Sequence, residues 1–240
     1  MSFSNSETPV LFNKIKDVYM RISRAAMKAD RNPDEVRLIA VTKTVPVEAI
    51  REAVDCGLRV FGENRVQEAK QKIMNSGIRS LSEQLAWHLI GHLQKNKTKD
   101  AVQLFDLIHS VDSAELAEEI DRQAERIGKV QRVLVQVKLS EEETKYGIAE
   151  EALPQMLESI EGKDHIRAEG LMTIPPFLRD LNSVRPYFIR LRELRERTEA
   201  RGFALPELSM GMSHDFEAAI EEGATMVRIG TAIFGERSLR

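Results

Sequence analysis

The sequence predicts an α/β protein that folds as a single (β/α)8 TIM barrel, with one extra helix in front of the barrel. Short apolar runs rich in β-branched residues alternate with amphipathic stretches from about residue 37 to the end of the chain. Runs that are apolar throughout are typical of parallel strands that helices cover. Eight such runs fit a barrel of about 200 residues, at the short end of the size range. A doubly wound open sheet is the alternative that the alternation alone leaves open.

The extra helix comes first in the chain. Residues 10–29 carry apolar side chains three and four positions apart, which predicts an amphipathic helix outside the strand and helix alternation. We expect residues 1–9 to be a disordered tail. No linker, low-complexity stretch or repeat divides the remainder, so residues 10–240 are predicted to form one domain.

The strands and helices then follow in order. The predicted strands are residues 37–42, 59–61, 86–90, 107–110, 130–137, 168–173, 207–210 and 225–229. The predicted helices are residues 46–56, 65–76, 95–104, 114–127, 149–160, 182–200 and 214–222, with a short helix after the last strand. Glycines follow several of these helices, as expected where a chain leaves a helix through the left-handed conformation.

Composition and charge exclude several classes of protein. The 240 residues include 35 Lys and Arg against 38 Asp and Glu, and 42% are hydrophobic, values typical of a globular chain with a sizeable core. The near-neutral balance provides no general attraction to nucleic acid or to a membrane surface, so neither partner is expected. A single cysteine, Cys56, excludes an intramolecular disulfide. Because the start lacks a signal-peptide pattern, we expect a cytoplasmic protein, and we expect a monomer.

Two lysines are candidate reactive amines. In a parallel barrel the functional groups lie at the carboxyl ends of the strands, and Lys43 follows the first strand. Partial desolvation there lowers the pKa of a lysine and makes the amine nucleophilic. The alternative is a lysine whose side chain extends into water. Lys145, beside Tyr146 and Gly147 after the fifth strand, is the second candidate.

Polar residues also follow the second and third strands. Asn64 is interpreted either as a polar contact at the mouth of the barrel or as the N-cap of the next helix, and taken alone the residue favours the cap. His88 and His92 are four residues apart, but the segment is predicted to be a strand, where this spacing does not form a metal-binding pair. No metal site is predicted. His88 is expected to be a packed or hydrogen-bonded core residue, and His92 is expected to line the mouth.

The last two loops predict a phosphate site. Ser209, Gly211, Met212 and Ser213 lead from the seventh strand into a helix, and Arg228, Gly230 and Thr231 leave the eighth strand. Small and hydroxyl residues at helix N-termini bind anions through backbone N–H groups, although ordinary caps and glycine turns explain each loop separately. The combination with a lysine on the first strand favours a ligand that carries both an aldehyde and a phosphate, and pyridoxal 5′-phosphate fits that description.

Eight segments together carry a resemblance to a known family. They are LIAVTKTVP, FGENRVQEA, WHLIGHLQKNK, HSVDS, TKYGI, GLMTIPP, LSMGMSHDFEAAI and MVRIGTAIFGER. The chain from about residue 37 to residue 237 resembles the pyridoxal phosphate homeostasis protein family, the YggS/PROSC family, which is similar to the barrel domain of alanine racemase, the type III fold of pyridoxal phosphate proteins.

The resemblance assigns roles to individual residues. It implies that Lys43 forms the internal aldimine, a Schiff base with pyridoxal 5′-phosphate, and that Gly230, Thr231 and residues 209–213 hold the phosphate. It also implies that Asn64, His88 and Arg228 line the pocket. Some family members carry a second lysine two positions after the first. Val45 stands there in this chain, so a role of that kind would pass to Lys145.

Three hypotheses about function compete. The resemblance implies a binding protein that buffers or delivers pyridoxal phosphate to apo enzymes, affects amino-acid and keto-acid balance and has no established catalytic residue or turnover. The second hypothesis is an amino-acid racemase or decarboxylase, which needs an acid or base on each face of the substrate. The barrel leaves no residues for the second domain of a racemase. The third is a cofactor-free aldolase with Lys43 as its Schiff base, which the residues by themselves permit.

Overall fold

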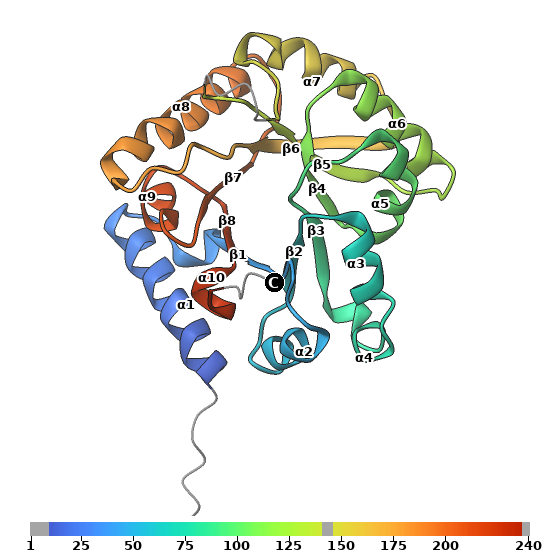
Figure 1. Cartoon of the computed structure of the whole chain (residues 1–240). Coiled ribbons are helices and arrows are strands. Elements are labelled where there is room, and N and C mark those ends of the chain that lie inside the picture. Colours follow the sequence, from blue (N-terminus) through green and yellow to red (C-terminus); the bar gives the residue numbers. More distant parts are fainter. Residues whose placement is uncertain (1–9, 141–145, 237–240) are drawn as a thin grey trace, which may run out of the picture.

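The computed structural model describes residues 10–140 and 146–236, and within them eight parallel strands close a barrel. The strands follow one another around the ring in sequence order, and β1 pairs with β8 to close it. Figure 1 shows the helices arranged around the outside of this ring. The predicted (β/α)8 barrel is therefore confirmed, and the open sheet is excluded because such a sheet has two unpaired edges.

The elements have the following bounds. The strands are β1 Arg37–Val41, β2 Val60–Glu63, β3 Ala86–Leu89, β4 Leu107–Val111, β5 Gln131–Gln136, β6 Ile166–Met172, β7 Glu207–Met212 and β8 Met226–Ile229. The helices are α1 Val10–Lys28, α2 Val47–Asp55, α3 Val66–Ile73, α4 Ser76–Arg79, α5 Thr98–Leu104, α6 Ala114–Glu125, α7 Leu153–Glu161, α8 Leu181–Glu199, α9 Phe216–Glu221 and α10 Thr231–Phe234. Short 3-10 turns lie at Pro33–Glu35, Ser82–Gln84, Lys95–Lys97 and Glu150–Ala152.

One predicted helix is replaced by two shorter helices in the structure. Instead of running through residues 65–76, the chain ends α3 at Ile73 and starts α4 at Ser76. Asn75 is the cause, because its side chain accepts a hydrogen bond from the backbone N–H of Gly77 and caps a new helix start. The change keeps α3 short, and α3 still packs against β2 and α5.

Side chains alternate between two cores along each strand. In β1, Leu38 and Ala40 belong to the large core between the strands and the surrounding helices, whereas Ile39 belongs to a small core inside the barrel. Leu107, Leu134, Met172 and Met226 complete this inner core. The alternation of period two means that the next inward positions after Ile39 are Val41 and Lys43. The inner core is thus a closed apolar layer, above which the strand ends carry polar groups.

Helix α1 completes the outer layer next to the last barrel unit. It lies beside α9 and α10, as Figure 1 shows. Arg21 bonds Glu217 at 2.7 Å and lies over the Phe216 ring at 4.5 Å, and Lys28 bonds Glu221 at 2.7 Å. The predicted amphipathic face is buried against these elements, through Leu11, Ile15, Val18, Ile22, Ala25 and Ala26. None of the helices in the described ranges has the length and apolar character that crossing a membrane requires.

Candidate functional site

A cavity of about 520 Å³ opens at the carboxyl ends of the strands. This is a volume typical of small-molecule sites, which are concave and largely apolar with a few polar groups. Among the residues that line it are seven predicted site residues: Lys43, Asn64, Met212, Ser213, Arg228, Gly230 and Thr231. Sequence reasoning missed Val41, Ile90, Ile174, Phe177, His214 and Glu236, which also line it. A second cavity, of about 430 Å³, lies between the end of α7 and the loop before β7, and none of the predicted site residues lines it.

Lys43 reaches the cavity because of the strand before it. Ile39 faces the interior of the barrel, and Val41, two residues later, lines the cavity floor together with Lys43. The chain turns sharply after the lysine, since Thr44 has a positive φ of 63°. Such a backbone is rare for a β-branched residue, so the turn that ends the lysine segment is strained.

The two loops predicted to bind phosphate meet at one point beside β1. Ser213, at the end of β7, accepts hydrogen bonds with its Oγ from the backbone N–H groups of Gly230 at 3.2 Å and Ala232 at 3.4 Å. Gly230 lies against the end of β1, because a Cβ on it would be 3.4 Å from the backbone oxygen of Val41. Two backbone donors and one hydroxyl therefore converge at the wall of the cavity that carries Lys43. An anion with several oxygen acceptors would suit this place, where its oxygens would replace the Ser213 hydroxyl as acceptors of the two N–H groups.

Arg228 is the cation on the inner side of the cavity. Its side chain is buried, and it donates hydrogen bonds to Ser209 Oγ at 2.5 Å and to the backbone oxygen of Thr173 at 2.9 Å. Burial lowers the pKa of Arg228 to about 10, a change that the charge of Asp215 opposes. The guanidinium therefore stays charged at neutral pH and can only donate hydrogen bonds.

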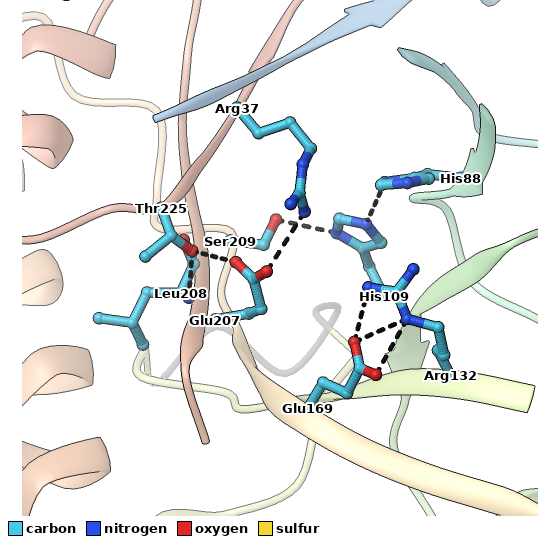
Figure 2. Close-up of polar contacts among 9 residues, drawn as sticks. All are labelled: Arg37, His88, His109, Arg132, Glu169, Glu207, Leu208, Ser209 and Thr225. Atoms are coloured by element: carbon cyan, nitrogen blue, oxygen red, sulfur yellow. Dashed lines mark hydrogen bonds and ion pairs between the residues drawn. The ribbon is translucent and has the colours of Figure 1, made fainter. Parts of the chain in front are cut away.

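Two buried histidines continue the network below Arg228. Figure 2 shows Ser209 bonded to His109 and His109 bonded to His88, with Ser209 Oγ 2.9 Å from His109 Nδ1 and His109 Nε2 3.0 Å from His88 Nδ1. Burial lowers the pKa of His88 to about 3, and the charges of Arg37 and Arg132 add to this effect. Burial also holds the pKa of His109 well below its usual range. Both imidazoles are therefore neutral at physiological pH.

The predicted residues Ser209 and His88 are thus placed beneath the cavity instead of among its lining residues. The prediction of His88 as a hydrogen-bonded core residue is confirmed, while its contact with a cofactor stays a prediction. His109 was missed, although it stands two residues after the inward-facing Leu107 in β4. The alternation of inward and outward side chains along β4 could have identified His109 as an inward-facing residue.

A separate group of polar contacts joins β7 to β1 and β5 to β6. Figure 2 shows Glu207 bonded to Arg37 at 3.2 Å and to Thr225 at 2.6 Å, and Arg132 bonded to Glu169 at 2.8 Å. Arg37, Arg132 and Glu207 lie near the amino ends of their strands, Thr225 directly precedes β8, and Glu169 is in the middle of β6. None of them is among the described residues that line the cavity. Residues at the amino end of a barrel serve stability.

The structure also defines the roles of the predicted residues Asn64 and Gly211. Asn64 is not the N-cap of α3: Arg65 occupies that position without a side-chain cap bond, so Asn64 lines the cavity instead. Gly211 has a positive φ of 91°, and a Cβ on it would be 2.6 Å from Ala219 Cβ. It therefore lets β7 pass close to α9, and this brings Met212 and Ser213 to the cavity.

Side chains that follow β3, β4 and β5 form another group of polar contacts. His92 Nδ1 lies 3.5 Å from Asp112 Oδ2, and the His92 ring stacks on Tyr146 with centroids 3.7 Å apart. The candidate amine Lys145 lies outside the described residues. Within the described ranges, no group of three or more histidine, cysteine or acidic side chains could hold a metal ion.

Comparisons with known proteins agree with this geometry. Residues 19–238 match the family model described as "Alanine racemase, N-terminal domain". The pyridoxal phosphate homeostasis protein of Aquifex aeolicus is 48% identical over 225 residues, which cover 93% of this chain and 97% of that protein. The structure of PipY from Synechococcus elongatus with PLP (pyridoxal phosphate) bound superposes with a TM-score of 0.78 at 40% identity, covering 90% of this chain and 100% of that one.

Alanine racemase shares the barrel alone. The structure of alanine racemase from Clostridium difficile matches with a TM-score of 0.69 at 16% identity, and the match covers 94% of this chain but only 57% of the racemase chain. At this identity the likeness concerns the fold, not the activity.

Proposed function

Because the chain belongs to the pyridoxal phosphate homeostasis protein family, we propose that it binds pyridoxal 5′-phosphate in the cavity of Lys43 and buffers or delivers this cofactor. One observation carries the proposal. Lys43 shares its cavity with the point at which Ser213 Oγ and the backbone N–H groups of Gly230 and Ala232 converge. An amine for an aldehyde and a donor cluster for a phosphate are the two groups that this ligand requires.

Each part of the cavity has a task in holding the ligand. When bound, the cofactor supplies an aldehyde that condenses with a primary amine, and Lys43 is the lysine of the described cavity lining. The backbone donors of Gly230 and Ala232, with the hydroxyl groups of Ser213 and Thr231, would bind the phosphate. Arg228 would supply a positive charge on the inner side of the cavity, and Asn64 would add a polar contact.

The proposal favours a carrier over an enzyme. Racemisation needs an acid or base on each face of the substrate, and no tyrosine is among the described residues that line the cavity. Tyr19 and Tyr187 lie on α1 and α8, and Tyr146 stacks on His92. The relatives are named for cofactor homeostasis, which agrees with a binding role. We extend the proposal to a cytoplasmic monomer whose partners are pyridoxal phosphate and apo enzymes that use it.

The visible spectrum of the purified protein tests the binding role. Mixed with pyridoxal 5′-phosphate, the wild-type protein should be yellow and its band should resist gel filtration, because the cofactor is attached to Lys43. Lys43→Ala should lose the band. Lys70→Ala, which removes an exposed lysine on α3, is the matched control and should keep it. A wild-type protein that stays colourless with the cofactor would favour the aldolase, and a yellow Lys43→Ala protein would show that another amine is used.

A further inference from the structure

A buried ion cluster lies behind the end of β1, the strand that precedes Lys43. Lys72, on α3, donates hydrogen bonds from Nζ to Glu63 Oε1 at 2.7 Å, to Glu68 Oε1 at 2.6 Å and to the backbone oxygen of Thr42 at 2.6 Å. The Lys72 and Glu63 residues are 7% and 0% exposed, so the pair is shielded from water. The cluster is on the outer side of β1 and β2, because Ala40, two residues before Thr42, packs in the outer core.

The same carboxylates bind the residues on both sides of Lys43. Glu63 Oε1 accepts a hydrogen bond from Thr42 Oγ1 at 2.6 Å, and Glu68 Oε1 accepts one from the backbone N–H of Thr44 at 2.5 Å. Lys72 joins the two carboxylates. The backbone before and after Lys43 is therefore connected to one buried cation.

The backbone at Thr44 needs such support. Its φ of 63° lies in the left-handed region, where a β-branched side chain is strained. A strained residue persists only when its surroundings fix it, and the bond from its N–H to Glu68 does so. Without that bond we expect the turn to relax and the direction of the Lys43 side chain to change.

The cluster is costly if stability is its only purpose. Burial raises the pKa of Glu63, a change that the hydrogen bonds from Lys72 and Thr42 oppose, and Glu63 Oε2 has no hydrogen-bond partner among the residues that the structure describes. Burial raises the pKa of Glu68 as well, but the bonds from Lys72 and the Thr44 N–H outweigh it and leave the pKa below its ordinary value. Buried ion pairs contribute little net stability, because desolvation offsets the attraction between the charges.

We propose that Lys72, Glu63 and Glu68 are positioning residues that fix the backbone on both sides of Lys43 and so aim its amine at the aldehyde of the cofactor. The inference rests on the proposed function. Attachment forms a bond between Lys43 Nζ of the neutral amine and the aldehyde carbon, and the aldehyde oxygen leaves as water with both amine hydrogens. Such a step depends on the approach of the two atoms, and a misplacement of about 1 Å can slow a reaction about 100-fold.

A double-mutant cycle with Lys43 tests the inference. In the otherwise wild-type chain, Lys72→Met should slow the growth of the visible band and weaken binding of pyridoxal 5′-phosphate, each by about 10-fold to 100-fold. In the Lys43→Ala chain, where the ligand is held without a covalent bond, Lys72→Met should leave the dissociation constant measured by calorimetry within about 2-fold. Lys70→Met, on the exposed side of α3, should change neither quantity.

Each other outcome overturns the inference. Equal losses in both backgrounds would mean that Lys72 maintains the cavity in general, and no loss in either would mean that the cluster does not aim Lys43. Failure of the proposed function looks different, because the wild-type protein itself would then show no band.

Smaller changes keep the test available if Lys72→Met does not fold. Thr42→Val removes the hydroxyl that bonds Glu63 at nearly constant volume, and Thr42→Ser restores it. Glu68→Gln removes the charge from a half-buried position, where a folded protein is expected. Thr42→Val and Glu68→Gln should slow attachment and Thr42→Ser should not. Equal rates for Val and Ser at position 42, or a wild-type rate for Glu68→Gln, would contradict the positioning role.

Discussion

At the scale of single residues, His88 and His109 combine two properties that rarely occur together. They are completely or nearly completely buried, yet they are titratable and lie near the charges of Arg37, Arg132 and Arg228. Their neutral rings can pass a hydrogen bond from Ser209 downward without adding a charge to the interior of the barrel. A second buried charge near Arg228 would be costly.

The histidines predict how stability depends on pH. In the unfolded chain His88 binds a proton near pH 6.5, whereas in the folded protein burial moves its pKa to about 3. Between these values the unfolded state binds more protons at His88, so this residue alone should lower the free energy of unfolding by about 1.4 kcal/mol for each unit of decreasing pH. Above pH 6.5 this contribution is constant. Urea unfolding between pH 7 and pH 4 measures it.

A variant separates this contribution from that of the carboxylates. His88→Gln should unfold with a shallower pH dependence, by about 1.4 kcal/mol per pH unit, because one of the linked protons is removed. If His88→Gln and the wild type show parallel curves, His88 is not neutral in the folded protein.

At the scale of elements, the register of β6 against β7 depends on a glycine. Gly170 pairs with Glu207, and a Cβ on Gly170 would be 1.9 Å from the Glu207 backbone oxygen. The contact is between two backbones in a closed sheet, so no side-chain rotation can relieve it. Glu207 also bonds Arg37 and Thr225, and these bonds connect the β6 and β7 pair to the closure of the barrel.

Gly170→Ala should therefore destabilise the protein, by about 1–3 kcal/mol or more, because the strands must move apart. The midpoint of urea unfolding provides the measurement. Gly162→Ala, at the end of α7, is the matched control: among the described residues the nearest atom to the added Cβ would be Glu158 O at 3.9 Å, and we expect a change within about 0.5 kcal/mol. Equal midpoints for the two variants would show that β6 and β7 tolerate the displacement.

At the scale of the whole molecule, the described chain is a barrel in front of which one helix packs. Its match covers 57% of the racemase chain, and an enzyme of that kind adds further residues to the same barrel. The described cavity lining offers Lys43 as its lysine and contains no tyrosine for the opposite face of a substrate. This lining agrees with the cofactor-binding role proposed above.

We therefore expect the loaded protein to act as a donor of cofactor and not as a catalyst. Incubated with L-alanine in heavy water, it should show no repeated exchange of the α-hydrogen by NMR, because a carrier holds the cofactor without turning over an amino acid. The same loaded protein should activate an apo enzyme faster than an equal concentration of free pyridoxal 5′-phosphate. An alanine racemase is the positive control for exchange. Multiple turnovers by the protein would replace the carrier with an enzyme.

The sequence by itself determined the order of the elements and the ends of the strands at which chemistry is placed. Continuous apolar runs and helical stripes are local patterns, so they predicted the barrel, the position of Lys43 at its mouth and the two loops that meet at Gly230. The family motifs lie in these same segments. The local pattern was insufficient at Asn64, where a cap and a cavity contact require the same residue type.

Only the tertiary structure decided which distant side chains meet. His109 and Ser209 are 100 positions apart, and Lys72 reaches Thr42 across 30 positions from a helix whose sequence indicates only an amphipathic surface. A periodic pattern shows which residues share a face, but it does not show which faces pack together or at what register. Barrel closure sets that register, and it thereby brings His109 beneath Arg228 and Lys72 behind Lys43.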